Sequence, residues 1–329
     1  MNNNQLLYFD ESTEIYWHGV IMGLAVLAGG ILFWMFAHRI RRGAAAPLKY
    51  VLLFGFPSAV ALSRLEYCWF RQDAYRGGLP DILDVSLGGF GLIGAMIAMS
   101  AVIAAVGGLD RRFSAAELFD AAAPAASAAI CIGRIAGYFS GEERGFELYT
   151  DFFRRVMFTV YDAGEDKIFV SVYPYEAIAA GLLFVVCIFT FDAVYRTRKF
   201  APGMVAVRFL LGFTLTQIIF ESWRSDSLFL VYLGFVRFNQ AFCAVVLAVL
   251  LVVLCVRYAK KFGYRHAQIG AWAALLLGIV LAFLCEFFMT GGNHLQNYCG
   301  MAVGLTVAGI VAHVIAGRVF AINLRADRH

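Results

Sequence analysis

Residues 121–145 read AAAPAASAAICIGRIAGYFSGEERG, and this stretch decides how the rest of the chain is interpreted. Its first half is apolar enough to lie inside a membrane, yet four ionisable side chains follow directly, namely Arg134, Glu142, Glu143 and Arg144. An ionised side chain inside a bilayer costs several kcal/mol unless it is paired or hydrated. We therefore expect these residues to face a polar cavity at the end of a membrane span.

The composition of the whole chain is that of a membrane protein. Hydrophobic residues make up 61% of the 329 positions and charged residues 15%, whereas soluble domains are about 25% charged. Apolar runs of about 20 residues, the length that crosses a bilayer, occur at approximately 17–37, 50–69, 87–107, 115–138, 173–192, 203–222, 238–257, 268–288 and 298–316. Open sheet edges cannot face lipid. The predicted fold is therefore an all-α, polytopic transmembrane helical bundle of about nine spans joined by loops.

The distribution of Lys and Arg predicts the orientation, because basic residues near helix ends favour the cytoplasmic side. If the N-terminus lies outside, the inner segments hold 16 of the 27 Lys and Arg residues and the outer segments hold 8. The residues before the first apolar run lack a basic region and a small-residue cleavage site, so the first helix is expected to remain as an anchor. We predict an outer N-terminus and a cytoplasmic C-terminus.

The cysteines give no sign of a metal site. All seven lie singly, mostly within apolar runs, with no CxxC pair and no His/Cys cluster at metal-ligand spacing. We interpret them as small apolar residues and expect neither a metal nor a cofactor. The basic residues follow the loops of one side, which indicates topology rather than nucleic-acid binding.

Ionisable residues also fall at the corresponding ends of other predicted spans. If those ends converge, one cavity is lined by Arg134, Glu142, Arg144, Glu176, Glu221 and Arg224. Guanidinium groups bind phosphate oxygens through two parallel hydrogen bonds, and carboxylates hold the guanidiniums in place. Such a ring suits the headgroup of an anionic lipid. The alternative is a set of interfacial ion pairs that only join the helices.

Several longer motifs occur in a fixed order along the chain. They are YWHGV (16–20), GGFGLIG (88–94), GRIAGYFSGEERG (133–145), YPYE (173–176) and IIFESWRSD (218–226). In this order they resemble the motifs of the prolipoprotein diacylglyceryl transferase family, whose signature is similar to GR(I/L)GNFxNGExxG. The similarity covers about residues 10–260. We therefore predict a transferase-like membrane domain at 1–260 and two additional helices with a tail at 261–329.

The resemblance implies an activity in the bacterial inner membrane. The family transfers a diacylglyceryl group from phosphatidylglycerol to the cysteine thiol of a prolipoprotein lipobox, forming a thioether and releasing glycerol phosphate. Phosphatidylglycerol, or a related anionic phospholipid, and a lipobox-containing prolipoprotein are thus the implied partners. The implied catalytic residues are Arg134, Glu142, Glu221 and Arg224, and the implied lipid-binding residues are Arg64, Gly141, Gly145, Tyr175, Glu176 and Gln217.

Five positions differ from the family motifs. His18 stands in place of Tyr, Gly89 in place of a His that is a proposed base, Gly137 and Ser140 in place of Asn, and Gln217 in place of Arg. We expect His18 to act as the replacement base, because imidazole titrates near neutral pH. Arg134 and Arg224 would stabilise the charge that develops on the departing phosphate.

Two other classes of function remain open. One is a catalytically degenerate or repurposed family member that binds phospholipid or lipoprotein, or that uses a different donor or acceptor. The other is a transporter or channel, in which Glu286 and His294 of the last two helices would line the pathway. No inverted repeat or broken-helix pattern supports a transporter.

Overall fold

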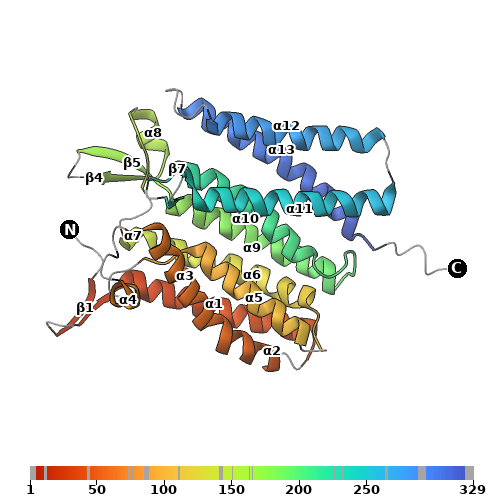
Figure 1. Ribbon diagram of the computed structural model, residues 1–329, viewed down its shortest axis with the longest axis horizontal. Helices are drawn as coiled ribbons and strands as arrows, with labels where there is room; N and C mark the ends of the chain where they lie inside the picture. The colour runs from red at the N-terminus through yellow and green to blue at the C-terminus, as the bar shows by residue number, and fades with distance from the viewer. Residues whose placement is uncertain are drawn as a thin grey trace.

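The computed structural model describes residues 5–10, 13–42, 45–72, 75, 78–84, 89–109, 112–140, 144–149, 151–162, 164, 166–225, 227–230, 233–263, 266–287 and 294–322. Long helices run roughly parallel to one axis and form a single bundle (Figure 1). They are α1 (Trp17–Ile40), α3 (Phe56–Phe70), α5 (Leu92–Leu109), α6 (Ala115–Ile135), α9 (Tyr173–Tyr195), α10 (Met204–Trp223), α11 (Phe238–Phe262), α12 (His266–Phe287) and α13 (His294–Phe320).

Shorter helices extend or connect these long ones. Along the chain, α3 is preceded by α2 (Ala45–Tyr50) and a π-helical turn, η1 (Val51–Gly55). Together they form an apolar helical segment from residue 48 to residue 70. The other short helices are α4 (Leu79–Leu83), α7 (Gly137–Ser140) and α8 (Asp151–Val156).

The prediction of a polytopic helical membrane protein is confirmed. Among the described residues, eight helical segments are long and apolar enough to cross a membrane, and α12 adds a shorter apolar stretch, Trp272–Cys285. The helix α5 begins at Leu92, about five residues later than predicted. Gly89 has a φ of +83°, a left-handed conformation that a right-handed helix cannot include.

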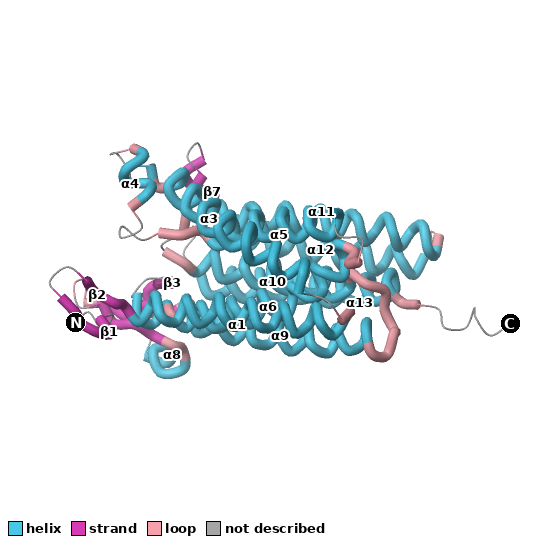
Figure 2. The backbone as a smooth tube through the Cα atoms, turned by 90° about the horizontal axis from the view of Figure 1, so that it is seen from below, coloured by secondary structure: helices cyan, strands magenta, loops and turns pink. Residues whose placement is uncertain are grey.

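Strands, which hydropathy did not predict, gather at one end of the bundle (Figures 1 and 2), called here the sheet end. The pair β1 (Gln5–Asp10) and β2 (Thr13–Tyr16) is antiparallel, as is the pair β6 (Phe229–Leu230) and β7 (Leu233–Arg237). A three-stranded antiparallel sheet has the order β3 (Arg144–Glu147), β5 (Lys167–Ser171), β4 (Thr159–Asp162). Strands with open edges are tolerated here because they lie outside the apolar helices.

The helix α6 forms the centre of the bundle and packs against α1, α5, α9 and α10. Small residues make this possible, since a Cβ atom on Gly29 of α1 would lie only 3.1 Å from that of Ala129. The start of α6 is fixed by a capping box in which Ser114 N donates to Glu117 Oε2 over 2.8 Å. The course of α6 is therefore well defined from its cap to the sheet end.

The last two helices pack closely on each other and on the rest of the bundle. A Cβ atom on Gly278 of α12 would lie 2.5 Å from the carbonyl oxygen of Gly304 of α13, so glycine is required at this crossing. In turn, α13 contacts α10 and α11. The division into segments 1–260 and 261–329 stays a prediction. Because the side chains of Glu286 and His294 lie outside the described residues, the predicted pathway through them is not described either.

Candidate active site

Two arginines share one buried carboxylate at the sheet end. Arg134, at the end of α6, places Nε 3.2 Å from Glu176 Oε2, and Arg224, directly after α10, places Nη1 3.7 Å from the same oxygen. The Glu176 side chain is 1% exposed, whereas both arginines keep a small exposed fraction. Two guanidiniums that contact the same carboxylate are held in position to donate forked hydrogen bonds to a phosphate.

A second buried carboxylate lies one helical turn before Arg224. Glu221 is 1% exposed, and its Oε1 accepts a hydrogen bond from Asn239 Nδ2 over 3.3 Å. Its Oε2 has no hydrogen-bond partner within the described residues. Gln217, one turn earlier on α10, is also buried. This face of α10 therefore carries polar side chains into the bundle below the arginine pair.

His18 lies near the same end of α6. Its Nδ1 is 3.2 Å from the carbonyl oxygen of Ala136, two residues after Arg134. The neighbouring Trp17 stacks on Phe139 with ring centroids 5.9 Å apart. The first turn of α1 thus reaches the region of the arginine pair, and the role of His18 as a base stays a prediction.

Two of the predicted lipid-binding residues support the sheet. The Tyr175 hydroxyl accepts a hydrogen bond from Phe158 N over 3.1 Å, and its ring contacts that of Trp223. Gly145 lies against β5, where a Cβ atom would be 3.1 Å from the carbonyl oxygen of Val170. Both residues hold the three-stranded sheet close to the helix ends, next to Glu176.

Arg64 of α3 holds the segment that connects α3 to α5. Its guanidinium donates to the carbonyl oxygens of Ile82, Asp84 and Gly89 over 2.8 to 3.0 Å. It also donates to the Tyr75 hydroxyl over 3.3 Å, and burial raises the pKa of Tyr75 from its ordinary value of 10.0. The structure thus shows Arg64 in contact with the connecting segment, and lipid binding by Arg64 stays a prediction.

The remaining predicted residues are not part of the described cluster. Gly141 and Glu142 lie outside the described residues, so their roles stay predictions. Arg144 was expected to line the cavity but forms an ion pair with Asp162 of β4, across the sheet. Asp162 lies on β4, which β5 separates from β3. The Arg144 carbonyl oxygen accepts a hydrogen bond from Ser225 N, directly after Arg224.

Sequence reasoning missed Glu66 and Tyr67, which lie on the last turns of α3. Glu66 is 8% exposed and accepts a hydrogen bond from Gly94 N. A Cβ atom on Gly89 would lie 2.3 Å from a ring carbon of Tyr67, so the Tyr67 ring fills the space beside that position. A charged residue inside an apolar run, in SRLEYCWF, was the signal that could have found Glu66.

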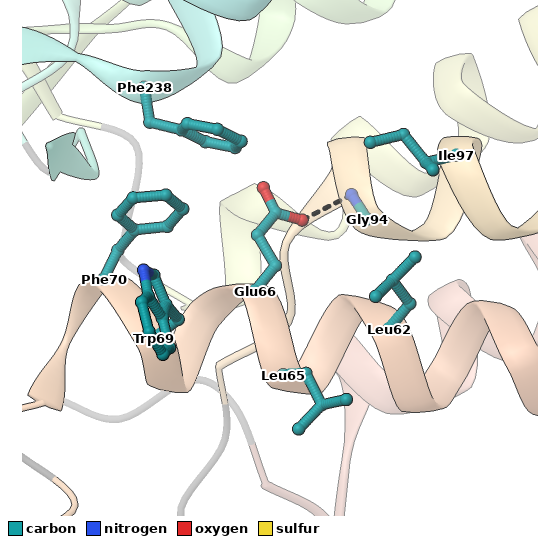
Figure 3. Close-up of a pocket in the computed structure, with 8 residues that line it drawn as sticks. All are labelled: Leu62, Leu65, Glu66, Trp69, Phe70, Gly94, Ile97 and Phe238. Atoms are coloured by element: carbon teal, nitrogen blue, oxygen red, sulfur yellow. Dashed lines mark hydrogen bonds between the residues drawn. The ribbon is translucent and has the colours of Figure 1, made fainter.

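Glu66 lies at a pocket of about 310 Å³ between α3, α5 and the start of α11. Figure 3 shows its carboxylate pointing away from α3, with one oxygen on Gly94 and the other toward the rings above. The pocket is lined by Leu62, Leu65, Glu66, Trp69, Phe70, Gly94, Ile97 and Phe238. The lining residues are apolar apart from the Glu66 carboxylate and the indole nitrogen of Trp69, and Glu66 supplies the only carboxylate among them.

These features define a polytopic helical membrane protein in which two arginines contact one buried carboxylate at one end of the bundle. The family model of prolipoprotein diacylglyceryl transferase matches residues 5–256, and the chain belongs to that family. The family resemblance of the motifs is thereby confirmed. The match ends before α12, so the last two helices lie beyond it.

Curated relatives carry the name phosphatidylglycerol–prolipoprotein diacylglyceryl transferase. That of Clostridium botulinum strain Langeland is 27% identical over 264 residues, which cover 79% of this chain and 100% of the relative. That of Clostridium botulinum strain 657 is 29% identical over 245 residues, with 72% and 92% covered. That of Clostridium kluyveri strain ATCC 8527 is 26% identical over 258 residues, with 77% and 95% covered.

Proposed function

We propose that this chain transfers a diacylglyceryl group from phosphatidylglycerol to the cysteine thiol of a prolipoprotein lipobox. Membership of the transferase family and the names of the relatives support this activity. The single observation that carries it is the arginine pair on Glu176, since Arg134 and Arg224 together offer a phosphate two forked donors.

In the proposed reaction, negative charge develops on the departing phosphate, next to these two arginines. The thiol of the acceptor loses a proton, and the thiolate sulfur attacks the glyceryl carbon of the donor. A C–S bond forms, the C–O bond to the phosphate breaks, and glycerol phosphate leaves with the electron pair of that bond. Arg134 and Arg224 stabilise the departing phosphate, and Glu176 holds both guanidiniums in position.

The orientation follows from the same proposal. We place the sheet end on the outer face of the bacterial inner membrane, where the lipobox cysteine of an exported prolipoprotein is presented, and the opposite end in the cytoplasm. The excess of Lys and Arg in the segments of the opposite end supports this. A reporter fused after His329 should be active only in the cytoplasm, and periplasmic activity of that fusion would contradict the orientation.

A second candidate function is that of a family member that binds the donor lipid without transferring it. The observation that favours it is at Gly89, the position of the family's proposed base, where the Tyr67 ring leaves no room for a side chain. Gln217 in place of an arginine also removes one cation from the polar face of α10. In this case the arginine pair would serve phosphate binding alone.

A transfer assay separates the two candidates. The full chain is reconstituted in vesicles with phosphatidylglycerol labelled in its acyl chains, and a lipobox peptide is added beside a control peptide with serine in place of cysteine. Transferase activity predicts label on the cysteine peptide only, with one glycerol phosphate released per peptide. Binding of the donor without any labelled peptide or glycerol phosphate would establish the second candidate instead.

A further inference from the structure

Glu66 is a buried carboxylate with one oxygen that could bind a ligand. It is 8% exposed, and one carboxylate oxygen is fixed by Gly94 N. The other oxygen, Oε1, has no hydrogen-bond partner in the part of the chain that the structure describes. Buried polar atoms normally have a partner. An unpaired carboxylate oxygen at an apolar pocket is therefore available to a proton donor that enters the pocket (Figure 3).

The backbone around Glu66 is shaped to receive its carboxylate. A Cβ atom on Gly91 would lie 2.1 Å from Glu66 Oε2, and one on Gly94 would lie 2.7 Å from it. Glycine at both positions lets the start of α5 approach the carboxylate closely. The segment 89–94 that resembles the family's HGGLIG motif is thus the segment that holds Glu66.

The pocket adjoins the polar face of α10. Phe238, in its wall, stacks on Phe70 with ring centroids 4.2 Å apart, and the next residue, Asn239, donates to Glu221. The carboxyl groups of Glu66 and Glu221 lie within electrostatic range of each other. Leu65 and Trp69 at the rim are exposed on the surface of the bundle, so the pocket opens toward the lipid.

We propose that Glu66 is the proton acceptor for the acceptor thiol and takes over the role that the loss of the family's histidine at position 89 leaves unfilled. This proposal rests on the proposed transferase function. The thiol enters the pocket and gives its proton to Glu66 Oε1, and the sulfur then forms the C–S bond while the C–O bond to the phosphate breaks. The proton leaves Glu66 for water after glycerol phosphate has departed. Tyr67, the next residue of α3, fills the space of the missing side chain at Gly89.

Glu66→Gln tests this role with little disturbance of the fold, because the amide oxygen still accepts from Gly94 N but cannot take up the proton of the thiol. Transfer to the lipobox peptide should fall by about 100-fold or more, the usual contribution of a general base. Binding of phosphatidylglycerol, measured by native mass spectrometry, should stay unchanged. Glu117→Gln is the matched control, because Glu117 lies in the first turn of α6 at the other end of the bundle. This variant should transfer at the wild-type rate.

Chemical rescue distinguishes a base from a structural carboxylate. Glu66→Ala leaves room beside Gly94, and formate added at constant ionic strength should restore part of the transfer, whereas chloride should not. Transfer by Glu66→Gln within about threefold of the wild type would overturn the proposal alone. So would loss of transfer in Glu66→Ala that formate does not restore, or a loss confined to His18→Gln, which would assign the base to His18. An inactive wild type would overturn the transferase function and this role together.

Discussion

Buried carboxylates at the two ends of the bundle differ in how many of their oxygens accept hydrogen bonds. Near the start of α6, Asp120 is fully buried and accepts hydrogen bonds from Tyr195 Oη, Gly203 N and Ala206 N over 2.7 to 2.9 Å. At the sheet end, Glu66 and Glu221 each have one oxygen without a partner among the described residues. A carboxylate with all its partners fixes neighbouring helices, whereas one with an unpaired oxygen is suited to a ligand.

The ion pairs show the same contrast. At the opposite end, Arg41 pairs with Glu117 over 3.1 Å, and the arginine side chain is 55% exposed. At the sheet end, one buried carboxylate serves both Arg134 and Arg224. Arg41 makes this contact with a largely exposed side chain, whereas the Glu176 carboxylate contacts two arginines that are largely buried. Substitutions at the two ends should therefore affect different properties of the protein.

The largest effect is expected at the arginine pair. Arg134→Ala removes a guanidinium that donates hydrogen bonds to the departing phosphate, so the transfer rate should fall by about 100-fold or more. Binding of phosphatidylglycerol should weaken by about 1.5–3 kcal/mol. Arg134→Lys should restore only part of both, because an ammonium lacks the fork. The checks are the transfer assay and lipid titration, with Arg41→Ala as the control. Equal losses in Arg134→Ala and Arg41→Ala would remove the contrast between the two ends.

The next effect concerns the position that lacks the family's histidine. Gly89→His places a side chain at a φ of +83° and against the Tyr67 ring, which should destabilise the protein by about 2 kcal/mol or more. Thermal unfolding in detergent measures this. The double variant Gly89→His with Tyr67→Ala should be more stable than Gly89→His. If Gly89→His alone unfolds at the wild-type temperature, the segment that holds Glu66 is more adaptable than the structure indicates.

A smaller effect is expected at Asp120, whose carboxylate accepts three hydrogen bonds. There we expect a loss of stability and no loss of activity. Asp120→Asn turns an amide donor toward groups that themselves donate, which should destabilise the fold by about 1–3 kcal/mol. The transfer rate per folded molecule should equal that of the wild type. Thermal unfolding and the transfer assay on the same sample separate the two quantities. A changed rate with unchanged stability would give Asp120 a functional role.

The smallest effect is expected at the ion pair of Arg41 and Glu117. Arg41→Ala should change the stability by less than about 1 kcal/mol, because the Arg41 side chain is 55% exposed and solvent screens its charge. The double variant with Glu117→Gln should differ little from the sum of the single variants. A coupling energy well above 1 kcal/mol in this cycle would place the opposite end among the strongly organised parts of the bundle.

The positions of the helices could be predicted because apolar runs of spanning length are visible in the sequence. The approach of Arg134, Glu176 and Arg224 could be anticipated because each follows or begins such a run and belongs to a recognisable motif. The ion pair of Arg144 with Asp162 depends on strand register, which hydropathy does not contain. Glu66 lies inside an apolar run, and only the packing of residues 89–94 shows what its carboxylate contacts.

A structure of the full chain bound to phosphatidylglycerol tests the central claim most directly, because it locates the phosphate relative to the arginine pair. We predict phosphate oxygens about 2.7–2.9 Å from guanidinium nitrogens of both Arg134 and Arg224, with Glu176 still in contact with both side chains. A phosphate bound elsewhere, with neither guanidinium in contact with it, would contradict the account.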